Sequence, residues 1–173
     1  ADSEHLEPVL RKTQLLRRLV DDLRTLALAD AGELVQNRAP LDLGRLTKRV
    51  VTDFQAQAQA TSVTLTSEVP AQLPMVAGDA GRIEQVVGIL LDNALKHTPA
   101  GGWIRAEVHA TANEVWTSVQ DSGTGIPPEA LPHLFERFYR TRTEQPVAGS
   151  GLGLAIAKAI ISAHSGRIWA ESV

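Results

Sequence analysis

The feature that most constrains this fold is an abrupt change in the spacing of apolar residues along the middle of the chain. Over residues 79–96 the apolar side chains recur three and four positions apart, which is the spacing of one face of an α-helix. Apolar and polar residues then alternate over 103–110 and over 114–121, with a polar turn at 111–113. A helix followed by a β-hairpin predicts an α+β fold, a two-layer sandwich with helices on one face of a mixed sheet.

Further helices and strands are expected on both sides of this centre. Asp42 and Asp79 are each placed to cap a helix at its N-terminus. The compact unit is expected to span 42–173. Its other elements are helices over 43–60, 129–139 and 152–164, strands over 63–67, 75–77 and 167–172, and a loop over 141–149.

Residues 1–31 are expected to form one long amphipathic helix before this unit, with residues 32–41 as a linker. The helical pattern begins near residue 5, and Gly32 is a suitable stop. Its apolar stripe has no expected partner in this chain except a second copy, which predicts a homodimer of the full protein through this helix. The stripe consists of Leu16, Leu19, Val20, Leu23, Leu26 and Ala27.

The composition excludes several classes of protein. A net charge of −3 argues against a nucleic-acid-binding surface, which is normally basic. With no cysteine, the chain can form neither a disulfide framework nor a thiolate metal site. No apolar run reaches the roughly 18 residues that a membrane-spanning helix needs. We therefore expect a soluble, cytoplasmic protein.

Residues 91–98 are the first of four segments that carry candidate chemistry. Asn93, Lys96 and His97 are three and four positions apart, on a face of the predicted helix opposite its core stripe. An amide oxygen suits Mg²⁺, and a lysine ammonium suits a phosphate. Taken alone, the same residues would equally well form an ordinary solvated face.

Residues 121–127 follow directly on a predicted strand. The ionised Asp121 only accepts hydrogen bonds, so it could accept the exocyclic amine of adenine, where guanine presents an oxygen instead. Gly123 and Gly125 would let the backbone approach a flat base and adopt positive φ. A plain turn is at least as good an interpretation of this segment alone, because Asp-x-Gly is common turn chemistry.

The other two segments flank the predicted loop over 141–149. Residues 135–140 combine aromatic side chains, which are more often core, with arginines, which are more often solvated. Residues 149–155 place three glycines before a helix, where backbone N–H groups and the helix dipole can bind a phosphate. No strand precedes them, as a dinucleotide fingerprint requires, and the Gly-Lys-Ser/Thr of a P-loop is missing.

In this order the four segments resemble the N box, first glycine box, F box and second glycine box of sensor histidine kinases. Residues 19–32 resemble the second helix of the family's dimerisation and phosphotransfer domain, and 164–168 its closing strand. The resemblance covers essentially the whole chain. It implies the left-handed, Bergerat-type α/β sandwich shared with gyrase-type ATPases and heat-shock chaperones. It also implies ATP and Mg²⁺ as ligands, and a response regulator receiver domain as partner.

The resemblance also gives each candidate residue a role. Asn93 is similar to the Mg²⁺ ligand, Lys96 and Arg140 to phosphate contacts, and Asp121 to the adenine-reading aspartate. Gly149, Gly151 and Gly153 are similar to the hinge and floor of the family's ATP lid. The complete nucleotide-binding set implied by the resemblance is Asn93, Lys96, His97, Asp121, Gly123, Gly125, Ile126, Gly149, Ser150, Gly151, Leu152 and Gly153.

Three features depart from the family's pattern. Many relatives carry a second asparagine where this chain has Ile89, which we expect on the nucleotide face rather than in the core. The family usually adds another strand after a segment like 171–173. The family's phosphorylated histidine lies in a His-Glu-Leu-Arg-Thr-Pro-like segment, which surrounds none of His5, His97, His109, His133 and His164.

The leading interpretation is the ATP-binding catalytic portion of a two-component sensor histidine kinase. It would transfer the γ-phosphoryl group of ATP to a histidine outside this chain, for relay to a response regulator. The alternative is a nucleotide-binding sensor or docking module with little or no kinase activity, which Ile89 and the missing acceptor segment favour. A gyrase-, chaperone- or mismatch-repair-type ATPase needs a carboxylate one turn before Asn93 to activate water, and Ile89 cannot provide it.

Overall fold

The computed structural model describes residues 2–34, 37–140 and 150–172. Within α1, the side chains of residues 2–9, 11, 14, 15 and 18 are also outside the description. The elements are α1 (Asp2–Asp30), β1 (Ala39–Leu41), α2 (Leu43–Ala60), β2 (Thr64–Glu68), β3 (Val76–Gly78), α3 (Ala80–His97), β4 (Trp103–Ala110), β5 (Val115–Asp121), the 3₁₀ helix η1 (Leu131–His133) and α4 (Gly153–Ala163).

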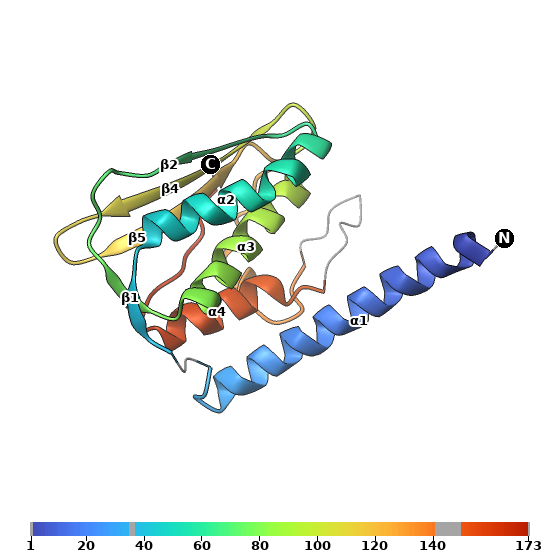
Figure 1. The fold of residues 1–173 in the computed structure, drawn as a ribbon, viewed down its shortest axis with the longest axis horizontal. Helices are drawn as coiled ribbons and strands as arrows, with labels where there is room; N and C mark the ends of the chain where they lie inside the picture. Colours follow the sequence, from blue (N-terminus) through green and yellow to red (C-terminus); the bar gives the residue numbers. More distant parts are fainter. Residues whose placement is uncertain (1, 35–36, 141–149, 173) are drawn as a thin grey trace.

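A mixed three-stranded sheet forms one layer, with the strand order β2-β4-β5. β2 pairs parallel to β4, and β4 pairs antiparallel to β5 through the predicted hairpin. Figure 1 shows α2 and α3 lying together across one face of this sheet. The predicted α+β fold with a mixed sheet and helices on one face is therefore confirmed. β1, within the segment expected as a linker, pairs antiparallel with β3.

Both long helices of the domain begin at the predicted caps. The Asp42 carboxylate accepts a hydrogen bond from the Arg45 backbone N–H at 2.9 Å, and Asp79 accepts from that of Arg82 at 3.2 Å. Each carboxylate satisfies an amide that the first turn of a helix leaves unpaired. The helices then pack their apolar faces on the sheet, where Leu91, Ile104 and Ala106 are fully buried.

A second apolar cluster joins α1, α3 and α4 on the side of α3 away from the sheet. In this cluster Leu26 of α1 packs with Val86 of α3 and Ile156 of α4, and each is at most 4% exposed. Leu19 is partly buried against the same cluster. The expectation that the α1 stripe has no partner within this chain is therefore wrong for Leu19 and Leu26.

The rest of the α1 stripe faces away from the domain. Leu16 and Val20 are each 63% exposed and Leu23 is 51% exposed. Together with the exposed Ala27 they recur at steps of four, three and four, so they form one apolar seam along the helix. In Figure 1, α1 projects beyond α4, and its N-terminal half extends away from the domain.

The predictions of a helix over 129–139 and of a strand over 167–172 are wrong. The helix expected over 129–139 is reduced to η1, since Pro132 lacks an amide hydrogen and Phe138 adopts a left-handed φ of 62°. Residues 167–172 form no strand with described residues. Side chains tether this segment instead, through an Arg167–Glu114 ion pair at 3.2 Å and a Ser172 hydroxyl that accepts from the Ile126 N–H at 2.9 Å.

None of the described helices combines the length and the apolar character that crossing a membrane would demand.

Candidate functional site

The last turns of α3 carry three of the predicted site residues. Asn93 and His97 are half-buried, whereas Lys96 is exposed. The Lys96 ammonium forms an ion pair with Asp92, one turn earlier, at 2.5 Å. The Asn93 side chain makes no hydrogen bond with another described residue, so its amide is free to bind a ligand. This end of α3 therefore presents an amide oxygen and a movable cation.

The turn after β5 lies directly against this end of α3. Asp121 is exposed, and its Oδ1 atom accepts a hydrogen bond from the Gly123 N–H at 2.9 Å. A Cβ atom at Gly123 would lie 2.5 Å from the carbonyl oxygen of His97 and 2.6 Å from Asp121 Oδ1. No side chain fits in that space, so glycine is required for the carboxylate of Asp121 to come this close to α3.

The far end of the same turn is held by the C-terminal segment. Gly125 has a φ of 70°, a conformation that glycine adopts without strain. The next residue, Ile126, donates its backbone N–H to the Ser172 hydroxyl. Ser172 was not predicted as a site residue. No periodic or motif signal marks it in the sequence, because the contact joins segments that are 46 residues apart.

A backbone hydrogen bond joins the segments before and after residues 141–149, which lie outside the described residues. The Phe138 N–H donates to the Gly151 carbonyl at 2.9 Å. Gly151 has a φ of 72°, and a Cβ atom there would lie 2.9 Å from the carbonyl carbon of Phe138. Ser150 Oγ accepts from the N–H of Leu152, which is fully buried. Arg140 is exposed, and the predicted site residue Gly149 lies outside the described residues.

The first turn of α4 packs beside α3 near Asn93. A Cβ atom at Gly153 would lie 3.3 Å from Ile89 Cγ2, so these two helices touch at Ile89. Asn93 follows Ile89 by one helical turn, which is about 6 Å along the axis. The N–H groups that begin α4 therefore lie in the same region as the amide of Asn93, an arrangement that suits an anion and its metal counterion.

Ile89 lies close both to the candidate site and to an apolar cluster. It lies one turn before Asn93, as expected, but it is also partly buried against the α1–α3–α4 cluster. The expectation that Ile89 lies outside the core is therefore wrong. The reason is that α4 covers this side of α3, which the apolar spacing within α3 alone does not reveal.

An Ile89→Asn variant tests both the packing of Ile89 and its closeness to the candidate site. We expect the melting temperature to fall by about 3–6 °C, because an amide would replace a partly buried apolar side chain at a cost of about 1–2 kcal/mol. We also expect ATP binding to depend more strongly on Mg²⁺, since a second amide would stand beside Asn93. Ile168→Asn is the matched control, because Ile168 packs on the same cluster but is not on α3. Equal magnesium dependence in both variants would contradict the proposed facing of Ile89.

The histidine at the end of α4 has a structural role. His164 Nδ1 donates to the Ile160 carbonyl at 2.8 Å, and Nε2 accepts from the Asp79 N–H at 3.0 Å. Both ring nitrogens are therefore engaged, which ties the C-terminus of α4 to the start of α3.

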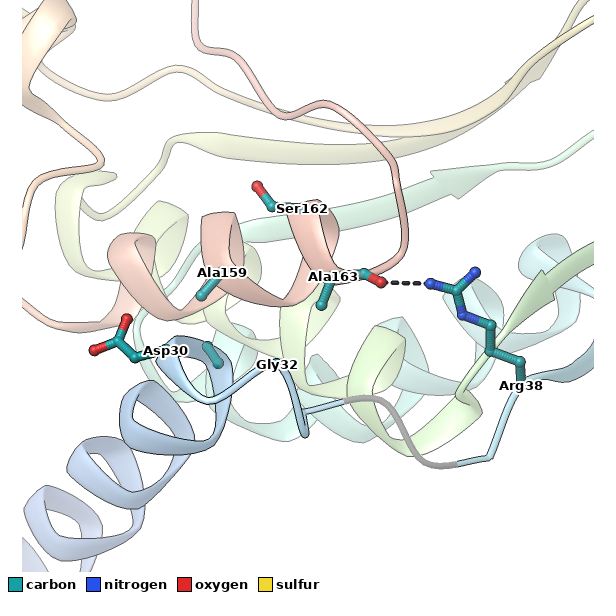
Figure 2. Close-up of a pocket in the computed structure, with 7 residues that line it drawn as sticks. Asp30, Gly32, Arg38, Ala159, Ser162 and Ala163 are labelled. Atoms are coloured by element: carbon teal, nitrogen blue, oxygen red, sulfur yellow. Dashed lines mark hydrogen bonds between the residues drawn. The ribbon is translucent and has the colours of Figure 1, made fainter.

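A separate cavity of about 370 Å³ lies between the end of α1 and α4 (Figure 2). Asp30, Arg38 and Ser162 contribute the polar side chains of its lining. Arg38 donates to the Ala163 carbonyl, and Asp30 pairs with Arg137 at 2.6 Å. Its charged groups are thus already paired, and no predicted site residue lines it. It is not the candidate nucleotide site.

Comparison with known proteins identifies the family to which this fold belongs. Residues 78–173 match the family described as histidine kinase-, DNA gyrase B-, and HSP90-like ATPase. The adaptive-response sensory kinase SasA of Microcystis aeruginosa is 34% identical over 172 residues, which cover 98% of this chain and 45% of that protein. The chain thus spans less than half the length of this curated relative.

Two solved structures show a similar fold. Full-length ShkA in complex with AMPPNP has a TM-score of 0.82 at 28% identity, over 99% of this chain and 37% of that one. Histidine kinase ThkA in complex with the response regulator protein TrrA has a TM-score of 0.72 at 28% identity, over 91% of this chain and 44% of that one. With its mixed sheet, its two glycine turns and a family match over more than half of its length, this chain belongs to the histidine kinase-, DNA gyrase B- and HSP90-like ATPases, as a catalytic domain of the histidine kinase type.

Proposed function

We propose that this chain binds ATP with Mg²⁺ beside the C-terminal half of α3 and donates the γ-phosphoryl group to a histidine outside this chain. The phosphoryl group would then pass to the receiver domain of a response regulator. The similarity to a sensory kinase, to a kinase bound to AMPPNP and to a kinase in complex with a response regulator supports this proposal. The site of action would be the cytoplasm, or the cytoplasmic face of the inner membrane if the parent protein is anchored there.

The observation that carries the proposal is the contact between the Gly123 backbone and the His97 carbonyl. It brings an acceptor-only carboxylate and the polar end of α3 to one place. Asp121 Oδ1 is engaged by the turn, whereas its other oxygen makes no hydrogen bond with a described residue. That oxygen would accept the exocyclic amine of adenine.

The phosphates would extend from the adenine toward the start of α4. Lys96 would exchange its ion pair with Asp92 for a phosphate, and Arg140 would approach the outer phosphates. His97, Gly125 and Ile126 would border the base. Gly149, Gly151 and Gly153 would form the hinge and floor of an ATP lid, with Ser150 and Leu152 between them, and Gly151 is bonded to the Phe138 N–H.

The described residues fit a magnesium ion held mainly by the nucleotide. They contain no group of three or more His, Cys, Asp or Glu side chains that could hold a metal alone. Mg²⁺ does not need such a group, since it usually keeps several waters and binds one or two protein oxygens plus phosphates. Asn93 would supply its protein oxygen, and the bound ion would neutralise charge on the phosphates.

Isothermal titration calorimetry tests this function directly. We expect Mg-ATP to bind and GTP to bind at least about tenfold more weakly, which corresponds to ~1.4 kcal/mol. Asn93→Ala should raise the Kd of Mg-ATP by about tenfold and change binding in EDTA little, because it removes only the metal ligand. Asn113→Ala is the control, since Asn113 lies exposed in the hairpin turn at the other end of β4. An Asn93→Ala variant that kept the parent's magnesium dependence would contradict the assignment.

We further propose that residues 1–31 are a dimerisation helix, 32–41 a linker and 42–173 the catalytic domain. The exposed seam of α1, formed by Leu16, Val20, Leu23 and Ala27, would contact the same seam of a second copy. Leu26, on the adjacent side of α1, would remain packed on the domain.

A Val20→Glu variant tests the seam. We expect it to weaken self-association at least about tenfold in analytical ultracentrifugation, because the dimer would have to bury a charge among apolar side chains. ATP binding should not change. Leu10→Glu is the matched control, because Leu10 is 60% exposed but lies on another side of the helix. A parent chain that stayed monomeric at high concentration would contradict the proposed dimer.

One observation favours a second candidate, a nucleotide-binding sensor with little or no kinase activity. Ile89 fills the contact between α3 and α4 with an apolar side chain beside Asn93. An apolar group there offers no ligand to a metal or its waters. Phosphoryl transfer to an added acceptor fragment distinguishes the two functions.

A further inference from the structure

The turn that carries Asp121 leaves the sheet through an unusual hydrogen-bond pair. Ile104 and Asp121 are the last paired residues of β4 and β5, so Trp103 and Ser122 are next in register. The Ser122 N–H donates to the Trp103 carbonyl at 3.0 Å. The Trp103 N–H, however, donates to the Ser122 side-chain hydroxyl at 2.8 Å. In an ordinary antiparallel pair that second bond would go to the backbone carbonyl of Ser122.

The hydroxyl therefore replaces a backbone carbonyl at the edge of the sheet. Both backbone groups of Trp103 therefore remain hydrogen-bonded to Ser122. The backbone carbonyl of Ser122 is not needed for this pair, so the chain can turn away from the sheet at this residue. That turn directs the Gly123 N–H back to Asp121 Oδ1 and places Gly123 against the carbonyl of His97. A strand that continued in regular register would instead carry the chain past α3.

The same hydroxyl also lies close to Gly102, in the turn that follows α3. A Cβ atom at Gly102 would lie 2.8 Å from Ser122 Oγ and 2.5 Å from Thr98 Cγ2, so glycine is needed for this approach. Thr98 is 7% exposed and donates its hydroxyl to the Ala94 carbonyl, which holds that turn on the helix. Ser122 is thus hydrogen-bonded to the first residue of β4 and lies close to the turn that follows α3.

We propose that Ser122 is a positioning residue of the nucleotide site, whose hydroxyl sets the place of the Asp121 carboxylate relative to α3. The proposal rests on the proposed function of Asp121 as the acceptor for adenine. Ser122 acts through Asp121 and the Gly123 turn, and it does not itself contact the base. The hydroxyl, rather than the size of the side chain, is the determining feature.

The test is a double-mutant cycle between Ser122 and Asp121, with the Kd of Mg-ATP measured by calorimetry on the full chain. Ser122→Ala should raise the Kd by about fivefold in the parent, the range expected for loss of one hydrogen bond. In the Asp121→Ala background the same change should raise the Kd by less than about twofold, because the group that Ser122 positions is gone. Ser122→Thr, which keeps a hydroxyl, should bind within about twofold of the parent.

Thr111→Ala is the matched control for stability. The Thr111 hydroxyl also accepts from backbone N–H groups, those of Asn113 and Glu114, at the opposite end of the same hairpin. Its loss should lower the melting temperature about as much as Ser122→Ala and leave the Kd unchanged.

Three results would overturn the inference. The first is a Ser122→Ala variant with the same Kd for Mg-ATP as the parent. The second is a Ser122→Thr variant that binds as weakly as Ser122→Ala. The third is a Ser122→Ala substitution that raises the Kd by the same factor in the parent and in the Asp121→Ala background. If the parent binds ATP and Asp121→Ala weakens it while Ser122→Ala does not, only this inference fails. If the parent does not bind ATP, the proposed function fails and the inference fails with it.

Discussion

Asp121→Ala is expected to weaken Mg-ATP binding by about ten- to hundredfold. A hydrogen bond to a charged group contributes about 1.5–3 kcal/mol, which corresponds to that range in Kd. The substitution also removes the acceptor for the Gly123 N–H, so the turn against His97 loses one of its restraints. Affinity for GTP should change little, because guanine offers Asp121 no exocyclic amine at the equivalent position.

Two further variants make this result specific. Asp53→Ala removes an exposed carboxylate from α2 and should leave nucleotide binding unchanged. Asp121→Asn is less informative than alanine, since its amide can rotate and still present an oxygen. The measurement is a calorimetric titration with ATP and GTP on each variant. An Asp121→Ala variant that bound ATP as tightly as the parent would show that the adenine pocket lies elsewhere.

The second large effect concerns phosphoryl transfer. Incubated with labelled ATP and Mg²⁺, this chain should bind the nucleotide and retain no acid-labile, base-stable phosphate. Transfer requires a nucleophile held in line with the γ-phosphate. In place of an acceptor segment the chain offers five histidines, and the structure describes the side-chain surroundings of all except His5.

The described histidines are poorly placed to act as acceptors. Both ring nitrogens of His164 are engaged within the fold. His109 is stacked on Trp116 and contacts Ser118 on the sheet, and His133 pairs with Glu136 at 2.8 Å. His97 shares a rigid helix with Asn93, so it cannot move into line independently of the metal ligand.

A separate two-helix fragment with a genuine acceptor segment should restore transfer when it is added to this chain. The labelled phosphate should then appear on the fragment. It should not appear on a control fragment whose acceptor histidine is replaced by alanine. Label on this chain alone that disappears in His5→Ala would overturn the interpretation of His5. Label on neither protein, with ATP still bound, would favour the nucleotide-sensor alternative and implicate Ile89.

Local sequence patterns were sufficient for the elements that depend on neighbours along the chain. Asp79 caps α3 because its carboxylate reaches the N–H of Arg82 three residues later. The β4–β5 hairpin follows from alternation and from the Thr111 turn, which closes with a hydrogen bond to Glu114. The sequence also indicated a close backbone approach at Gly123, two residues after the strand-end aspartate. It predicted a flat base as the neighbour, whereas the structure places the carbonyl of His97 there.

Contacts between distant segments were decided only by the tertiary structure. The apolar spacing of α1 shows which residues share a stripe, but not which of them meet another element. In the fold, Leu26 packs against α4, while Val20 and Leu23 stay exposed. The ion pair between Asp30 and Arg137 likewise joins residues that are 107 positions apart.

Ser122 illustrates the same limit within the candidate site. Its residue type is ordinary for a turn, so the sequence gives no reason to single it out. Only the register of β4 against β5 makes its hydroxyl the partner of the Trp103 N–H. Local hydrogen bonds are set by residues a few positions apart, whereas this contact exists only once two strands and the end of α3 have packed together.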